Sequence, residues 1–244
     1  MRQLWPDAAT LDDRQLEDLY TYPADERWLV VNFVSSADGA VELDGTARGL
    51  STPADQEVLK LGSDLADVML VGATTAMAEG FRGKHPDTAT RERRLRHGLS
   101  EVPPTAVVTS GDSLPADAPV ITEAETPTIV ITCATAPGEK LNAWREAGAD
   151  LLITGMGSVN LATATKSLAE RGLRHVDCEG GPHLFGGLLA AGLVDELRLT
   201  VSPMLVSGSH SRIATGELFD TLELELASVV SEEGAMMMRY LVQS

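Results

Sequence analysis

Residues 176–187 read Val-Asp-Cys-Glu-Gly-Gly-Pro-His-Leu-Phe-Gly-Gly, and this stretch predicts a strand that leads directly into a helix. We expect the strand to end at Glu179 and the helix to begin at Pro182, because proline suits the first helical position. The two glycines between them let a ligand approach backbone amides, and a helix N-terminus offers unpaired N–H groups to a pyrophosphate. A lone Gly-Gly pair is more often an ordinary turn. Glu179 beside it favours a site, because a buried carboxylate is costly without partners.

The same alternation of strand and helix recurs along the chain. Four apolar runs are nearly unbroken and too short for helices, as is typical of strands covered on both faces. They comprise residues 68–71, 106–108, 129–131 and 151–153. Helical patterns begin between several of these runs, near Thr52, Leu141 and Leu161. Strands that alternate with helices predict an α/β fold with a mainly parallel central sheet flanked by helices.

The C-terminal part of the chain has a different pattern. Apolar and polar residues alternate over residues 196–201 and 222–226, and residues 236–242 have the composition of one more strand. Period-two alternation without intervening helices predicts an antiparallel C-terminal part of the sheet. Residues 1–26 are polar and acidic, and we interpret them as an N-terminal arm that packs on the body or on a partner subunit. Residues 27–244 are expected to form a single domain.

The composition excludes several classes of protein. A chain of 244 residues can bury a core without disulfide staples, and its two cysteines cannot form a disulfide framework. No apolar run approaches the ~20 residues of a membrane span, and no charged start with a following apolar stretch indicates a secretory signal. The net charge of −17 repels nucleic acid and anionic membranes, and the five histidines show no metal-binding spacing. We therefore expect a cytoplasmic protein that acts on a small molecule and binds no metal, nucleic acid or membrane.

Further candidate residues follow the predicted strands, since ligands bind at the carboxyl ends of strands in open α/β sheets. They are Gly72, Thr75 and Glu79 after the first apolar run, Thr109 and Ser110 after the second, and Gly155 after the fourth. Gly155 begins a Gly-x-Gly segment that lacks the third glycine of a dinucleotide fingerprint. The Asp-Gly pair at residues 38 and 39 is usually only a turn. Asp38 is nevertheless the best-placed carboxylate to anchor a polar substrate or to relay a proton.

Residues 82–97 form a basic island in an acidic chain. They hold six cationic side chains and two acidic ones, a net charge of +4, against −17 for the whole chain. Most charge runs are solvated faces of loops and helices. The alternative is a mobile lid whose arginines attract a phosphorylated ligand, with Arg82 closest in sequence to the candidate residue Glu79.

Three segments resemble the pyrimidine reductase family of riboflavin biosynthesis. They are VNFVSSADGAV (31–41), ADVMLVGATTAMAEGF (66–81) and HVDCEGGPHLFGGLLAAGLVDELRLTVSPMLVSG (175–208). The resemblance runs from about Trp28 to Tyr240, and the chain closely resembles the stand-alone actinobacterial-type branch, which has no fused deaminase domain. It implies the dihydrofolate reductase-like fold, NADPH as the hydride donor and a homodimer.

The resemblance also implies roles for individual residues. It places Thr75 and Glu79 near the cofactor, Glu179 against the substrate and residues 181–187 in the cofactor-binding turn, and it matches residues 36–39 to a Ser-Leu-Asp-Gly segment. We therefore expect two catalytic residues, Asp38 and Glu179. The expected cofactor-binding residues are Gly72, Thr75, Glu79, Thr109, Ser110, Gly155, Gly180, Gly181, Pro182, His183, Leu184 and Phe185. The expected substrate-binding residues are Asn32, Ser36, Asp38, Arg82 and Glu179.

The chain departs from the family pattern at several positions. The family usually has a lysine at Asn32, a Ser-x-Trp pair at Ala47 and Gly49, and an arginine at Ser63, so two cations that could meet a substrate phosphate are missing. Our leading prediction is an NADPH-dependent reductase of a 5-amino-6-ribosylamino-uracil phosphate, with hydride transfer to C1′ of the opened ribose. The alternatives are a dihydrofolate or pteridine reductase, and a nucleotide-binding module of the same fold without activity.

Overall fold

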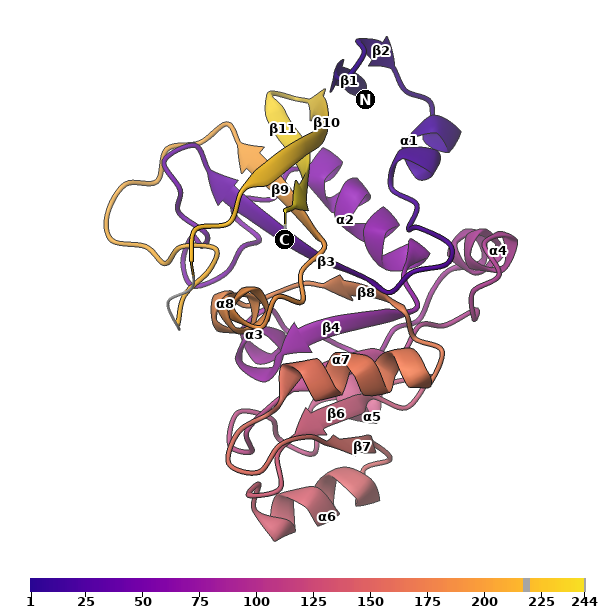
Figure 1. The fold of residues 1–244 in the computed structure, drawn as a ribbon, viewed down its shortest axis with the longest axis vertical. Helices are drawn as coiled ribbons and strands as arrows, with labels where there is room; N and C mark the ends of the chain where they lie inside the picture. The colour runs from indigo at the N-terminus through magenta and orange to yellow at the C-terminus, as the bar shows by residue number, and fades with distance from the viewer. Residues whose placement is uncertain (217–219, 244) are drawn as a thin grey trace.

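One mixed β-sheet runs through the protein (Figure 1). The structure, a computed structural model, describes residues 1–216 and 220–243, and within them eleven strands pair in the order β2-β1-β10-β11-β9-β3-β8-β4-β5-β6-β7. From β9 to β7 all neighbouring strands run parallel. They are β9 (Glu196–Ser202), β3 (Trp28–Ser36), β8 (His175–Cys178), β4 (Val68–Gly72), β5 (Thr105–Val108), β6 (Ile129–Thr132) and β7 (Asp150–Ile153).

The remaining strands are antiparallel to their neighbours. They are β11 (Ala235–Val242), β10 (Leu224–Glu232), β1 (Arg2–Trp5) and β2 (Ala9–Thr10). The predicted α/β fold, mainly parallel with an antiparallel C-terminal part, is confirmed with one difference in detail. The strand β9 pairs parallel with β3 and is antiparallel only to β11. An alternating pattern reports the two faces of a strand and does not identify its neighbours.

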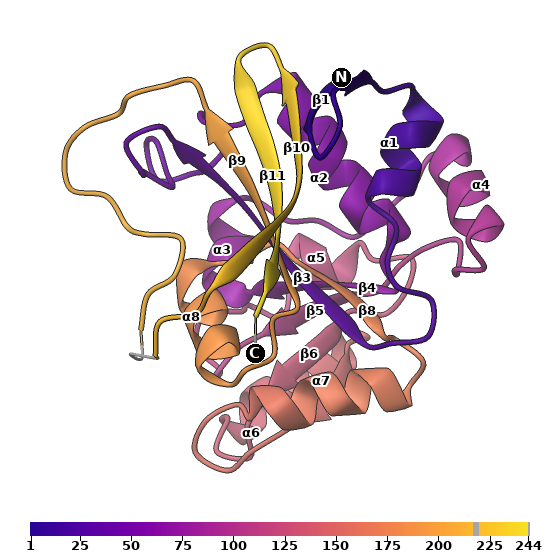
Figure 2. The same ribbon diagram turned by 45° about the horizontal axis from the view of Figure 1, so that its top comes forward.

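Helices cover both faces of the parallel strands (Figures 1 and 2). On one face lie α7 (Leu161–Glu170) and α8 (Pro182–Ala190), and on the other lie α2 (Pro53–Leu65), α3 (Ala73–Ala78), α5 (Pro119–Thr122) and α6 (Gly138–Glu146). The helix α2 begins as predicted, with Pro53 at its first position and the Thr52 hydroxyl accepting a hydrogen bond from the Asp55 amide at 3.2 Å. The chain between strands therefore forms the expected flanking layers.

The side chains of β3 divide between these two layers, because successive residues of a strand point to opposite faces. Leu29 and Val31 pack into the core under α7 and α8. Asn32 points the other way, toward Gly62 of α2. A polar group therefore stands on the buried face of a central strand, where a site can form.

The strands β4 and β8 are neighbours, but the helices that follow them lie on opposite faces of the sheet. The chain after β4 enters α3, and the chain after β8 enters α8. Such a divergence opens a crevice at the carboxyl ends of the strands, where α/β proteins bind ligands. The Gly72 amide donates a hydrogen bond to the Gly180 carbonyl across this point, at 2.9 Å.

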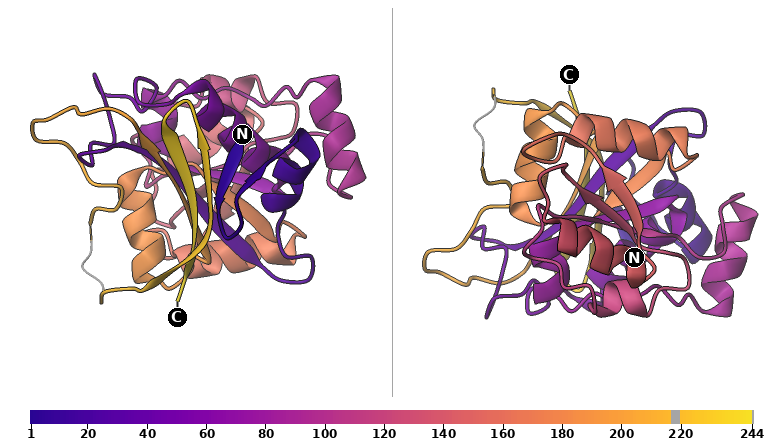
Figure 3. Two further views of the ribbon diagram at one scale, coloured as in Figure 1. Left: turned by 90° about the horizontal axis from the view of Figure 1, so that it is seen from above. Right: turned by 90° about the horizontal axis from the view of Figure 1, so that it is seen from below.

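The N-terminal segment joins the sheet of the body (Figure 3). The strand β1 pairs with β10, and α1 (Asp13–Leu19) shares a hydrophobic cluster with α2 and with Val230 and Met237. Tyr20, which follows α1, is 1% exposed. In this chain residues 1–26 therefore pack on the same body as the rest of the fold.

The strand β9 is an internal strand of the sheet. Its two neighbours are β3 and β11, and its residue Leu197 is buried in the core. In the part of the chain that the structure describes, no helix combines the length and apolar character needed to cross a membrane.

Candidate active site

A cavity of ≈ 490 Å³ lies between α2 and the central strands and extends to the turn after β8. This volume falls in the range of small-molecule sites, about 300–1,000 Å³. Asn32 of β3 and Arg198 of β9 line its inner wall, α2 and the loop of residues 41–51 line a second side, and α3 with the start of α8 forms the third. Of the predicted site residues, the cavity brings together Asn32, Thr75, Glu79, Glu179, Gly181, Pro182 and His183.

The turn after β8 holds no side chain that could fill it. The Gly180–Gly181 peptide bond is cis. A Cβ at Gly181 would lie 2.1 Å from the Thr75 hydroxyl oxygen, so this close approach of α8 to α3 requires glycine. No side chain caps α8, and the N–H groups of its first turn have no partner within the helix. The edge of the cavity therefore presents an open helix N-terminus that can hold an anionic group.

Glu79 fixes the loop that forms one side of the cavity. Its carboxylate accepts a hydrogen bond from the Ala47 amide at 2.7 Å. Glu79 follows α3 directly, so this bond ties the loop of residues 41–51 to the end of α3. The predicted cofactor-binding residue thus lies at the cavity and positions its wall.

Two carboxyl groups lie at the end of β8: Asp177 is buried within the strand, and Glu179 is partly buried just after it. The Glu179 side chain is 14% exposed, and the Lys84 ammonium lies 3.9 Å from its carboxylate. Burial raises the pKa of Glu179, against the opposing effect of Lys84. Burial, and then the charge of Glu179, raises the pKa of Asp177 to about 7. Carboxyl groups that keep a proton near neutral pH can donate it to a bound molecule.

Two charged residues near the inner wall were not among the predicted site residues: Arg198 lines the cavity, and Asp177 accepts a hydrogen bond from the lining residue Asn32. The Asn32 amide donates to Asp177 at 2.6 Å, and Arg198 Nε donates to Glu196 at 2.8 Å. All three charged side chains are buried. The sequence does contain a signal for Asp177 and Arg198, because both stand between apolar residues of a strand. Burying a charge there is costly unless the charge is paired or has a function.

The family model of the RibD C-terminal domain matches residues 27–236. The chain belongs to this family. It is 27% identical over 194 residues to a 2,5-diamino-6-ribosylamino-4(3H)-pyrimidinone 5′-phosphate reductase of Archaeoglobus fulgidus, covering 79% of this chain and 88% of that one. A reductase of the same name from Methanothermobacter thermautotrophicus is 28% identical over 207 residues, covering 82% of this chain and 90% of that one.

Solved structures share the fold of this chain. A pyrimidine reductase-like protein of Corynebacterium diphtheriae superimposes with a TM-score of 0.84 at 22% identity, covering 94% of this chain and 99% of that one. A riboflavin biosynthesis reductase of Saccharomyces cerevisiae gives a TM-score of 0.67 at 16% identity, covering 94% and 98%. At these identities the likeness concerns the fold alone.

The structure places Asp38 and Ser36 of this RibD-family chain outside the cavity lining. The Asp38 carboxylate accepts hydrogen bonds from Ser36 and from the amides of Val206, at 3.2 Å, and Ser207, at 2.8 Å. The bond from Ser36, followed by those from the two amides, lowers the pKa of Asp38 to about 2. Asp38 therefore fastens the segment after β9 to the end of β3, and the catalytic role of Asp38 and substrate binding by Ser36 stay predictions.

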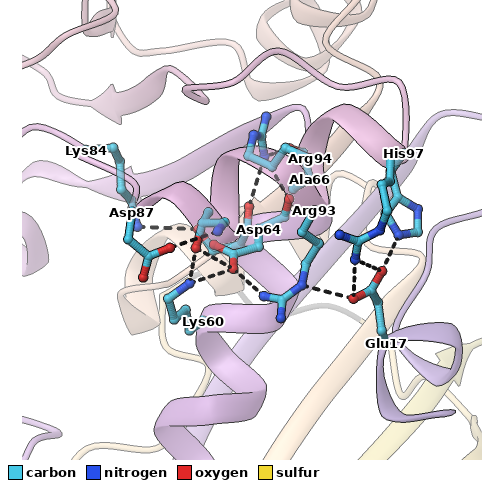
Figure 4. A network of polar contacts seen from close by, with 12 residues as sticks. Glu17, Lys60, Asp64, Ala66, Lys84, Asp87, Arg93, Arg94 and His97 are labelled. Carbon is cyan, nitrogen blue, oxygen red and sulfur yellow. Dashed lines mark hydrogen bonds and ion pairs between the residues drawn. The ribbon is translucent and has the colours of Figure 1, made fainter. Parts of the chain in front are cut away.

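The packing of residues 82–97 gives no support to the alternative of a mobile lid. These residues include the helix α4 (Thr88–Arg96), which packs beside α2, and none of them lines the cavity within the described chain. Arg94 is fully buried and donates to the carbonyls of Asp64 and Ala66 at 2.9 and 2.8 Å (Figure 4). Arg82, predicted to bind substrate, pairs with Glu123 at 2.6 Å. The charges of the basic island are thus largely matched by acids and carbonyls of the body, which a count along the sequence does not reveal.

Figure 4 shows how the last turn of α4 is fixed. Arg93 and His97 both contact Glu17 of α1, at 3.0 and 2.7 Å, and Arg93 also pairs with Asp64 of α2 at 2.7 Å. One helix of the basic island therefore joins α1 to α2 through ion pairs. Lys84 differs from these cations of the basic island, because it lies in the loop before α4 and reaches Glu179.

Gly72 and Gly180, also predicted to bind the cofactor, are joined to each other by a backbone hydrogen bond and do not line the cavity, and the other predicted cofactor residues occupy two kinds of place. Thr109, Ser110 and Gly155 lie just beyond the carboxyl ends of β5 and β7, outside the cavity lining. The side chains of Leu184 and Phe185 are buried in the core, so only their backbone is available to a ligand. Among the described residues no group of three or more His, Cys, Asp or Glu side chains could hold a metal ion.

Proposed function

We propose that this chain reduces a pyrimidine precursor of riboflavin, of the 5-amino-6-ribosylamino-uracil phosphate type, at C1′ of its opened ribose. The observation that carries the proposal is the meeting of Glu179 and the open Gly180–Gly181 turn at one cavity of ≈ 490 Å³. Membership of the RibD C-terminal domain family supports it, as do the relatives named as pyrimidinone phosphate reductases. We also propose a homodimer of the stand-alone branch type.

NADPH fits the turn after β8. When bound, the cofactor supplies the hydride of the reaction. The uncapped N-terminus of α8 would hold its phosphates through backbone amides, because the glycines leave the approach free and the helix dipole favours negative charge. Thr109 and Ser110 follow β5 at the same edge of the sheet and would hydrogen-bond the 2′-phosphate.

Glu179 supplies the proton that the reaction needs. Reducing the C1′=N bond of an opened ribosylamino group adds one hydride to carbon and one proton to nitrogen. Glu179 lines the cavity, and burial raises its pKa, so it is the carboxyl group from which a proton can pass to the substrate nitrogen. Burial and the charge of Glu179 raise the pKa of Asp177 to about 7, so near neutral pH the two carboxyl groups together can hold the one proton that the reaction uses.

Lys84 brings a cation close to Ser63, one of the two positions at which this chain lacks a cation that the family usually has. Its ammonium lies 3.3 Å from the Ser63 hydroxyl and 3.9 Å from Glu179. Ser63 stands where the family usually has an arginine. We therefore propose Lys84, in place of Arg82, as the member of the basic island that acts at the site.

Steady-state oxidation of NADPH tests the proposal. The purified protein is expected to reduce the ribosylamino-uracil phosphate, with dihydrofolate and the 2,5-diamino-pyrimidinone phosphate measured beside it. The diamino compound differs only at C2, where an amino group replaces the oxo group. Fluorescence titration is expected to give tighter binding of NADPH than of NADH. Turnover of dihydrofolate alone, or of none of the compounds, contradicts the proposal, and equal affinities contradict the choice of cofactor.

A further inference from the structure

Asp55 is a buried carboxylate on the wall of the cavity. It stands in the first turn of α2, is 6% exposed and lines the cavity. Its Oδ2 accepts a hydrogen bond from the Ser51 hydroxyl. Its Oδ1 has no hydrogen-bond partner among the described residues and is not sealed from solvent. A ligand in the cavity can therefore reach this oxygen.

The start of the helix accounts for only part of this arrangement. Acidic residues stabilise the first turn of a helix, and in a capping box the third helical residue turns back to the amide of the N-cap. Gln15 makes this bond at the start of α1. Within the described residues Asp55 makes no such bond with Thr52, whose hydroxyl instead accepts from the Asp55 amide. The Asp55 carboxylate is thus left free of the helix cap.

Within the described residues no cation pairs with Asp55. The cation Arg93 of α4 pairs with Asp64 of α2 at 2.7 Å, and Arg198 of the cavity wall pairs with Glu196 at 2.8 Å. A buried carboxylate without a cation is costly. Hydrogen bonds donated by a ligand would offset that cost, because a bond to a charged group is stronger than one between neutral groups.

The surroundings of Asp55 suit a flat ring with a polar edge. Val58, one turn further along α2, packs with Tyr20 and Met237 in one hydrophobic cluster, and all three line the cavity. Burial raises the pKa of the Tyr20 hydroxyl to about 12, and the charges of Glu196 and Asp55 add to the rise. Tyr20 and Asp55 therefore lie within range of each other. An apolar wall with a few polar groups is typical of a site for a small heterocycle.

The carboxylate selects the kind of ring edge that it can bind. A carboxylate only accepts hydrogen bonds, and each of its oxygens has two lone pairs. A pyrimidinone with an amino group at C2 presents two adjacent donors, the N3–H and an amino N–H. A uracil ring presents N3–H alone, between two carbonyl oxygens that a carboxylate repels. Oδ2 can accept from Ser51 and from a ligand together, so both oxygens of Asp55 are available to the 2-amino ring.

We propose that Asp55 is a specificity-determining residue, whose carboxylate accepts hydrogen bonds from N3–H and from a 2-amino group of the substrate ring. The inference rests on the proposed function, because it takes the ligand to be a ribosylamino-pyrimidine phosphate. The uracil form keeps N3–H and is bound with one hydrogen bond fewer. Since N3 and C6 are opposite each other in the ring, the ribosylamino group at C6 then points away from α2, into the cavity that Glu179 also lines.

The variant Asp55→Asn tests this role with little change of shape. The amide keeps one acceptor and replaces the other by a donor, which opposes a 2-amino group and suits a uracil carbonyl. It should therefore remove the preference for the 2-amino ring. Asp55→Ala is a second variant, which removes both acceptors. Glu57→Gln is the matched control, because Glu57 lies two residues further along α2, is exposed and is not among the described residues that line the cavity.

The test compares two ligands that differ only at C2. The Kd of the 2,5-diamino-pyrimidinone phosphate and of the ribosylamino-uracil phosphate is measured by calorimetry without cofactor, and kcat and KM are measured with NADPH. Wild-type protein is expected to bind the diamino compound roughly ten- to hundred-fold more tightly, the effect of one hydrogen bond to a charged group. Both Asp55 variants should lose this ratio, and Asp55→Ala should also weaken both compounds. Glu57→Gln should keep the ratio, and the Kd of NADPH should be the same in all variants.

Several outcomes overturn the inference. Equal Kd values for the two compounds in wild-type protein would do so, as would an unaltered ratio in Asp55→Asn. An equal loss of the ratio in Glu57→Gln would assign the effect to the charge at the start of α2. Wild-type protein that binds and reduces neither pyrimidine contradicts the proposed function itself. Reduction of both compounds with equal affinity contradicts only the role of Asp55, so the two failures are distinguished.

Discussion

Replacing Asp177 with asparagine is expected to make the protein less sensitive to alkaline pH. Asp177 is fully buried at the end of β8, and burial together with the charge of Glu179 raises its pKa to about 7 from an ordinary value of 3.8. Between these two values the folded protein holds a proton that the unfolded chain releases. The stabilisation is therefore complete below pH 3.8 and is lost as the pH rises to about 7.

The size of the effect follows from the range over which the two states differ. Stability falls by about 1.4 kcal/mol for each pH unit in which only the folded state is protonated. From pH 5 to pH 7 this amounts to about 3 kcal/mol, and above pH 7 the slope ends because the folded state ionises too. Asp177→Asn is isosteric with the protonated acid and does not titrate. The difference in unfolding free energy between variant and wild type should therefore shift by about 3 kcal/mol in favour of the variant between pH 5 and pH 8.

Urea unfolding followed by circular dichroism at pH 5, 6, 7 and 8 measures this shift. Asp38→Asn is the control, because hydrogen bonds lower the pKa of Asp38 to about 2. A lowered pKa gives stability that is present above the ordinary pKa and is lost only in acid, so this variant should differ from wild type by a constant amount from pH 5 to pH 8. A constant difference for Asp177→Asn as well would refute the raised pKa of Asp177.

Three further predictions concern the site and the assembly. Glu179→Gln is expected to lower kcat for the pyrimidine by about 10²- to 10⁴-fold at unchanged NADPH affinity, and an unaltered kcat would exclude Glu179 as the proton donor. Gly181→Ala should lower the unfolding free energy by about 1–3 kcal/mol through its contact with Thr75, and adding Thr75→Ala should restore most of the loss in urea unfolding; a double variant no more stable than the single one would contradict the contact. Sedimentation at micromolar concentration should give about twice the chain mass of 25.9 kDa, whereas a monomer at all concentrations would contradict the homodimer.

Features set by neighbouring residues could be predicted from the sequence. The strand 68–72, the capped start of α2 and the strand–glycine–helix unit at residues 176–187 each depend on a few adjacent residues, and the structure has all three. The position of Glu179 at the cavity was predicted from the same reasoning, because a turn at the end of a parallel strand leads to the ligand-binding edge of the sheet.

Features set by distant partners could not be predicted in this way. Asp38 has the sequence context of a catalytic turn, and its role is decided by two amides some 170 positions later in the chain. Arg94 is an ordinary member of a charge run until α2 brings backbone carbonyls around it. Arg198 stands between two apolar residues, a pattern that is typical of an edge strand with one exposed face. The strand β9, however, lies inside the sheet, and its residues are mostly buried. In each case the physical cause is tertiary contact, which local patterns do not report.

The most direct test of the account follows the transferred hydrogen. NADPH that carries deuterium at the reactive position of the nicotinamide is incubated with the protein and the ribosylamino-uracil phosphate, and the product is analysed by mass spectrometry and NMR. The account predicts a ribitylamino product with one deuterium at C1′, formed by wild-type protein and strongly slowed in Glu179→Gln. A product without deuterium, or with deuterium on a ring carbon, would contradict reduction at C1′, and the absence of any product would contradict the reductase itself.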